Sequence, residues 1–76
     1  METYYKLPKE DVNDVEGLIS EVYMKSGDQV EQGDLIYSFE TTKANVDVEA
    51  GHDGFIHYYV KANDTIEVGV NVCVIT

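Results

Sequence analysis

The sequence repeats itself at a spacing of 36 residues, and this repeat limits the folds that the chain can adopt. The segment VYMKSGDQVEQGDLIYSFE, residues 22–40, aligns without gaps with YYVKANDTIEVGVNVCVIT, residues 58–76. The two copies share a lysine, an aspartate, a glutamate and a glycine at equivalent places, and apolar residues align with apolar residues between them. Two copies are too few for a solenoid, which needs three or more repeats to bury its faces. The repeat therefore predicts two similar halves packed around a pseudo-two-fold axis on one shared core.

Short apolar runs separated by turn-forming residues make up most of the chain. Runs rich in Val, Ile, Tyr and Phe alternate with clusters of Gly, Asp and Asn, which is typical of a small all-β sandwich or barrel. The runs are TYYKL (3–7), GLISEVYM (17–24), DLIYSFE (34–40), NVDVEA (45–50), GFIHYYV (54–60) and NVCVIT (71–76). Every second residue is apolar in 46–50, as a half-buried strand requires. We find no stretch with a convincing helical period.

The chain length and its cysteine content predict one domain, residues 1–76, without a covalent staple. The single cysteine, Cys73, cannot form an internal disulfide, and alone it lacks the spacing of a structural zinc site. In the predicted strand 71–76, alternation places Cys73 on the face opposite to Val72 and Val74 and on the same face as Ile75. We therefore predict that Cys73 is a small buried hydrophobe rather than a redox thiol. We find no leader-like segment and no membrane-length apolar run. These features predict a soluble, cytoplasmic monomer.

The charge balance is strongly acidic. Five lysines and no arginine stand against 15 acidic residues, which gives a formal net charge of −10. This negative charge would repel a phosphate backbone, so we do not expect nucleic acid as a partner. The charge is consistent either with simple solubility or with partners that present basic surfaces.

An isolated lysine, Lys43, lies in the segment FETTKAN between the two copies of the repeat. Subtracting the repeat length from its number gives Leu7, beside the first predicted strand, so the symmetry predicts that the Lys43 turn lies at the opposite end of the domain from both termini. Threonine, alanine and asparagine around it favour an exposed tight turn. We expect the Lys43 side chain to point into water and to pack against nothing. Nothing apolar surrounds it to lower the amine pKa, so a separate enzyme would have to modify it.

The segment Glu40-Thr41-Thr42-Lys43-Ala44 resembles the attachment motif of the lipoyl domains, in which the modified lysine is presented at a hairpin tip. The segments around it are similar to the family over essentially the whole chain; they are residues 5–8, 25–30, 33–36 and 54–56. The resemblance implies a flattened barrel of two four-stranded antiparallel sheets with quasi-two-fold symmetry. It also implies lipoate as cofactor, attached to Lys43 through an amide by a lipoyl ligase or transferase, with Glu40, Thr42 and Ala44 forming the recognition surface.

The same resemblance implies a carrier rather than an enzyme. A lipoyl arm on Lys43 would shuttle acyl groups and electrons between active sites of a 2-oxo acid dehydrogenase complex, whose components include dihydrolipoamide dehydrogenase. The domain would have no catalytic residue and would belong to a dihydrolipoyl acyltransferase or a similar protein. Three positions depart from the family pattern. Thr42 replaces Asp or Ser, Gly51 stands where a proline is common, and Asn63 replaces a glycine in a turn where asparagine can adopt left-handed geometry.

Two alternatives to lipoylation remain open. Biotin is carried by a related fold on a lysine that is normally flanked by methionines, and neither Met1 nor Met24 is near Lys43 in the sequence. The other alternative is an unmodified binding or adaptor module, since such modules also use this fold.

We predict structural rather than functional roles for the histidines, tyrosines and glycines of the chain. His52 and His57, with Asp53 between them, could be drawn as an acid–base or metal pair, but an odd separation places strand side chains on opposite faces. We therefore predict no metal site. The six tyrosines are explained by strand propensity and packing. Gly27, Gly33, Gly54 and Gly69 are expected to supply positive φ or close strand approach.

Overall fold

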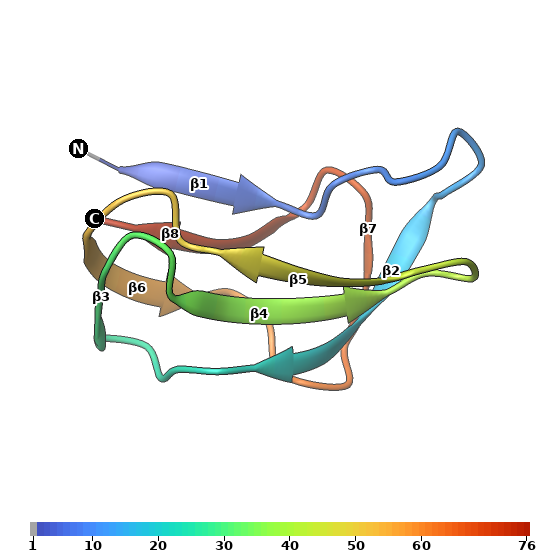
Figure 1. The fold of residues 1–76 in the computed structure, drawn as a ribbon. Helices are drawn as coiled ribbons and strands as arrows, with labels where there is room; N and C mark the ends of the chain where they lie inside the picture. The colour runs from blue at the N-terminus through green and yellow to red at the C-terminus, as the bar shows by residue number, and fades with distance from the viewer. Residues whose placement is uncertain (1) are drawn as a thin grey trace.

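The computed structural model describes residues 2–76, so Met1 of the predicted domain lies outside the described residues. These residues form eight strands, and none of them lies in a helix. The strands are β1 (Thr3–Lys6), β2 (Glu16–Val22), β3 (Gln29–Val30), β4 (Leu35–Glu40), β5 (Asn45–Glu49), β6 (Gly54–Tyr58), β7 (Thr65–Glu67) and β8 (Asn71–Ile75). They form two four-stranded sheets, ordered β1-β8-β6-β3 and β5-β4-β2-β7 (Figure 1). All pairings are antiparallel, so the predicted all-β fold with two four-stranded sheets is confirmed.

The internal repeat of the sequence is visible in the strand order. Strands at the same position in the two sheets are β8 and β4, β6 and β2, and β3 and β7. These are also the pairs of strands that lie 36 residues apart in the repeat. The turns repeat as well: the Asp28 carboxylate accepts a hydrogen bond from the Lys25 amide at 2.9 Å, and Asp64 accepts one from Lys61 at the same distance. Within this pair of turns Gly27 has a φ of 97° and Asn63 a φ of 76°. The expectation that Asn63 adopts the left-handed conformation of the glycine that it replaces is thus confirmed.

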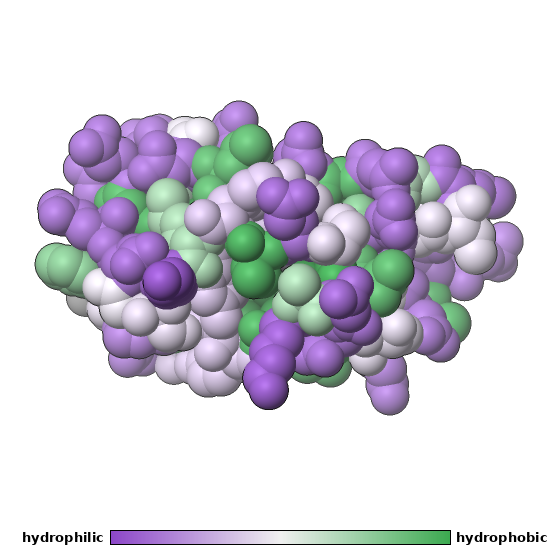
Figure 2. Space-filling view, turned by 90° about the horizontal axis from the view of Figure 1, so that it is seen from below, coloured by the Kyte–Doolittle hydropathy of each residue, from purple (hydrophilic) through white to green (hydrophobic). Residues whose placement is uncertain are grey.

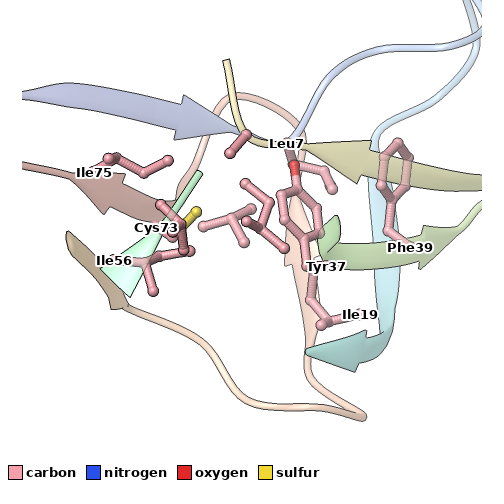
Figure 3. Packing of buried hydrophobic residues seen from close by; sticks show 11 residues of the cluster. Leu7, Ile19, Tyr37, Phe39, Ile56, Cys73 and Ile75 are labelled. Atoms are coloured by element: carbon pink, nitrogen blue, oxygen red, sulfur yellow. The ribbon is translucent and has the colours of Figure 1, made fainter. Parts of the chain in front are cut away.

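The hydrophobic core lies between the two sheets and takes side chains from both halves. Ile19, Tyr37 and Phe39 come from one half, and Ile56, Cys73 and Ile75 from the other (Figure 3). Cys73 is fully buried, as the sequence predicted, and its sulfur lies among these apolar side chains.

Two irregular pairings bring additional side chains into this core. The register of β4 on β5 shifts between Leu35 and Tyr37, and that of β8 on β1 shifts opposite Tyr5 and Lys6. At such a β-bulge one strand has a residue without a partner on the neighbouring strand, and side chains no longer alternate between the two faces of the sheet. The extra residues are Ile36 and Val72, 36 positions apart, and both are fully buried in the core. The expectation that Val72 lies out of phase with Cys73 is therefore wrong, since both side chains are in the core.

The hairpin between β4 and β5 and the ends of the chain lie at opposite ends of the molecule. Figure 1 shows the start of β1 and the end of β8 together at one end, while the tip that joins β4 to β5 projects at the other. This is the placement of residues 41–44 that the symmetry argument predicted.

The surface in view when the molecule is turned to show its underside is largely hydrophilic. Figure 2 shows polar side chains over most of this face, with apolar patches between them near its centre. An acidic, mostly polar surface accords with the charge balance of the sequence.

Burial of ionisable groups in the core predicts that the domain loses stability in alkali. Burial raises the pKa of the Cys73 thiol to about 12 and also raises the pKa of Tyr37, with a further contribution from Cys73. The unfolded chain therefore releases these protons at lower pH than the folded chain, so stability is intact below the unfolded pKa and falls as pH rises toward the folded one. We expect a loss of about 1.5 kcal/mol between pH 8 and pH 10, measured by urea unfolding at both values.

Replacing Cys73 with alanine is the control for this alkaline effect. The variant should start less stable because of lost packing, but it should lose less than half as much between the same two pH values. Equal pH slopes for the two proteins would contradict the assignment of the effect to Cys73.

Candidate functional site

The hairpin tip carrying Lys43 is a short turn closed by its own backbone. β4 ends at Glu40 and β5 begins at Asn45, and these two residues are paired. The Thr41 amide donates to the Ala44 carbonyl at 2.8 Å. The Lys43 amide donates to Thr41 Oγ1 at 3.3 Å, which is the local threonine bonding that the sequence predicted. The turn is therefore formed without any contribution from the Lys43 side chain.

The strands below the tip are anchored on both faces of their sheet. Phe39 and Tyr37 of β4 are buried in the core. On the opposite face Ser38 donates a hydrogen bond to Asp47, its direct partner on β5, and shares a 2.8 Å hydrogen bond with the Tyr23 hydroxyl. No pattern in the sequence indicates this polar cluster, because its three residues come from separate segments of the chain. Strands held in this way place the tip at a fixed position relative to the core.

The Lys43 side chain is exposed but does not stand alone. Its exposed fraction is 68%, so the expected exposure is confirmed. Its Nζ lies 3.2 Å from Oδ2 of Asp11, which is 29% exposed and belongs to the connection between β1 and β2. The expectation that this side chain contacts nothing is therefore wrong. The reason is that a loop 32 residues earlier in the chain folds beside the hairpin tip.

Asp11 belongs to a compact turn that is stabilised by its own carboxylates. Asp11 accepts a hydrogen bond from the Asn13 amide at 3.0 Å, and the Asp14 carboxylate accepts from the amides of Asp11 and Glu10 at 2.9 and 3.2 Å. The bond from Asn13 and, next, the bond from the Lys43 ammonium hold the pKa of Asp11 below its usual value. Asp and Asn at these positions signal a turn, but no pattern in the sequence indicates which distant residue the turn contacts.

The three residues expected to surround the attachment site lie together in the turn. Glu40 and Thr42 are exposed, while Ala44 is half-buried. They form a shallow depression with Lys43 and its immediate neighbours. A larger groove of about 500 Å³ lies beside it, between residues 13–18 on one side and 40–42 on the other, with Thr65 completing its wall.

The remaining candidate residues lie away from this end. Nδ1 of His52 hydrogen-bonds to the Asp53 carbonyl oxygen at 2.8 Å, within the connection that precedes β6, and His57 is exposed on β6. Across residues 2–76, no group of three or more His, Cys, Asp or Glu side chains is arranged to hold a metal ion. Over the same residues, no helix has the length and apolarity needed to span a membrane.

Comparison with known proteins places these features in a family context. A family model for biotin- and lipoyl-bearing domains, described as "Biotin-requiring enzyme", matches residues 5–75. The chain is 38% identical over 55 residues to the dihydrolipoyllysine-residue succinyltransferase component of the 2-oxoglutarate dehydrogenase complex of Bacillus subtilis (strain 168), covering 71% of this chain and 13% of that protein. It is 34% identical over 71 residues to the protein of the same description from Staphylococcus saprophyticus, covering 92% and 17% respectively.

A third similar protein has a different description. The pyruvate dehydrogenase complex protein X component, mitochondrial, of Chaetomium thermophilum is 32% identical over 62 residues, which cover 79% of this chain and 14% of that protein. The matched residues of this chain thus span between 13% and 17% of the length of these curated relatives.

Proposed function

This chain belongs to the family of biotin- and lipoyl-attachment domains, and on that premise we propose that it is a lipoyl carrier domain whose arm is attached to Lys43. The observation that carries the proposal is the position of this lysine. It is an exposed side chain at the tip of a closed hairpin turn, held above strands that are anchored in the core. A group attached to Lys43 would start at the end of the molecule that is opposite the start of β1 and the end of β8.

The residues of the tip suit the attachment of a lipoyl group through an amide. The Lys43 Nζ is accessible to an enzyme, and the turn keeps its shape without that side chain. We infer that Glu40, Thr42 and Ala44 supply the surface that a lipoyl ligase or transferase recognises. The lipoyl group, when attached, supplies the redox and acyl-carrying chemistry, while the chain supplies position and recognition.

The partners that we propose follow from the descriptions of the relatives. Two of them are succinyltransferase components of a 2-oxoglutarate dehydrogenase complex, and one is a component of a pyruvate dehydrogenase complex. We propose that the arm on Lys43 shuttles acyl groups and electrons between active sites of a complex of this 2-oxo acid dehydrogenase type, including its dihydrolipoamide dehydrogenase. In this role the domain is a carrier without catalytic residues, and we place it in the cytoplasm.

Biotin is the second candidate group, because the family model covers both kinds of domain. The sequence favours lipoate, since no methionine is adjacent to Lys43. An unmodified adaptor is the third candidate, and the presence of a lysine at the exposed tip argues against it.

The intact mass of the protein distinguishes these three candidates. The purified chain is incubated with ATP and either lipoate and a lipoyl ligase or biotin and a biotin ligase. We expect one lipoyl increment and no biotinyl increment. A Lys25→Arg variant is the matched control, because Lys25 is also an exposed turn lysine, and it should gain the same increment. A biotinyl increment alone would replace the proposal with a biotin carrier, and no increment would leave an unmodified binding module.

A further inference from the structure

The ion pair between Lys43 and Asp11 joins the candidate attachment site to the middle of a loop that is otherwise held at its two ends. The loop consists of residues 8–14, between β1 and β2. Among the described residues, every other hydrogen bond of this loop is internal, and the Lys43–Asp11 contact is its one polar link to the rest of the chain. Val12, near the middle of the loop, is 79% exposed and so contributes little packing. Backbone hydrogen bonds of Leu7 and Val15 hold the two ends of the loop, so the ion pair is the polar contact that holds its middle against the hairpin tip.

Attachment of an arm changes the charge on which this link depends. When an activated carboxylic acid acylates Lys43, an amide bond forms between Nζ and the carboxyl carbon, and the bond from that carbon to its leaving group breaks. The ammonium gives up two protons, and the nitrogen changes from a cation to a neutral amide. The carboxylate of Asp11 keeps its hydrogen bond from the Asn13 amide but loses its cationic partner.

We propose that acylation of Lys43 releases the 8–14 loop from the hairpin tip, so that the surface beside the arm differs between the unmodified and the modified domain. This inference rests on the proposed function, since it supposes that Lys43 is the residue acylated. Both groups are partly solvated, so the ion pair is of the modest, exposed kind. The expected change in the balance between attached and released loop is accordingly about 1.5- to 5-fold.

The release would alter the groove described above. Asn13 and Asp14 of the loop form the outer part of one wall of that groove, which continues along residues 15–18, and residues 40–42 of the hairpin form the other wall. The pairing of Leu18 with Glu40 fixes the groove where it runs along β2 and β4. Only its outer part, between Asn13 and Asp14 of the loop and the hairpin tip, would change when the ion pair is lost. A partner that binds in the groove would therefore meet a different surface once the arm is in place.

The experiment compares backbone amide signals of Val12, Asn13 and Asp14 by NMR in several forms of the chain at low salt. Lys43→Gln removes the positive charge without any ligase, Lys43→Arg keeps it, and Asp11→Asn removes the acidic partner while leaving an oxygen to accept from Asn13. We expect the lipoylated chain, Lys43→Gln and Asp11→Asn to shift these signals in the same direction, and Lys43→Arg to leave them near the unmodified positions. At about 1 M salt, where screening acts over roughly 3 Å, the differences should shrink.

The outcomes separate this inference from the proposed function. If the mass confirms lipoylation but the loop signals stay in place, the loop inference is overturned and the carrier function stands. If no ligase modifies the chain, the carrier function fails. The loop signals of Lys43→Gln and Lys43→Arg, compared with each other, still decide whether the charge at position 43 holds the loop. Identical loop signals in those two variants would overturn the inference.

Discussion

Replacing Lys43 with arginine is expected to abolish attachment of the arm completely while leaving the fold intact. An arginine guanidinium is always protonated and cannot form the amide, so the intact mass should show no increment after incubation with lipoate, ATP and ligase. The longer side chain keeps the positive charge and can still reach the Asp11 carboxylate, and the turn below it is closed by backbone groups and Thr41. The melting temperature should therefore stay within about 2 °C of the wild-type value.

Two results would contradict this prediction in different ways. An increment that persists in Lys43→Arg would move the attachment to another lysine of the chain. A large fall in melting temperature would mean that the Lys43 side chain contributes to packing, which its exposure does not indicate. The Lys25→Arg control guards against a general effect of lysine replacement on the ligase reaction.

The parts of the fold that the sequence predicts are those that repeat or alternate. The aligned halves predicted the symmetry, and the six apolar runs correspond to β1, β2, β4, β5, β6 and β8. β3 and β7 were not among those runs, because strands of two and three residues are too short to display an alternating pattern. The resemblance to lipoyl domains, rather than periodicity, supplied the total of four strands in each sheet.

Alternation also failed where a strand carries an extra residue. Strict alternation places Val72 and Cys73 on opposite faces, whereas the irregular pairing of β8 with β1 brings both into the core. The same event occurs at Ile36 and Tyr37 of β4. A bulge depends on how two strands pair, so a single strand read by itself does not reveal it.

In the candidate site, too, the features that depend on neighbouring residues were predictable from the sequence, and the contact between distant residues was not. The turn residues around Lys43 predicted an exposed tip, since threonine bonding and backbone closure are local properties. Asp11 was missed because its contact with Lys43 depends on the path of a loop 32 residues away. That path is set by how β1 and β2 enter different sheets, which no local pattern encodes.

The symmetry of the fold would make the proposed attachment at this tip compatible with a domain that is tethered at either end. β1 and β8 pair with each other, so the start and end of the described chain lie together, and the equivalent pair β5 and β4 places its hairpin at the opposite end. A linker at either end of the domain would leave the tip unobstructed. The two copies of one supersecondary unit thus place the candidate attachment site at the opposite end of the molecule from the start of β1 and the end of β8.

Replacing Gly54 with valine is expected to cause the largest loss of stability of any change considered, about 3 kcal/mol, with a fall in melting temperature of roughly 15 °C. A Cβ atom at Gly54 would collide with the backbone oxygen of Thr76 and would come within 2.7 Å of Cγ2 of Ile75. The neighbouring backbone cannot yield easily, because Phe55 and Thr76 exchange hydrogen bonds of 3.0 and 2.9 Å at this point. Gly54 is thus a position of close approach between β6 and the end of β8.

Gly33→Val is the matched comparison for Gly54→Val, because it tests backbone conformation without crowding. Gly33 has a φ of 94°, and no atom lies within 4 Å of the Cβ that would be added. Its valine variant should lose about 1–2 kcal/mol, the cost of a left-handed residue, and so fall between wild type and Gly54→Val in urea unfolding. If Gly54→Val does not fold, Gly54→Ala meets the same collision with a smaller side chain and should still be less stable than Gly33→Ala. Equal stability of the two alanine variants would show that the close approach to Thr76 does not limit what position 54 can hold.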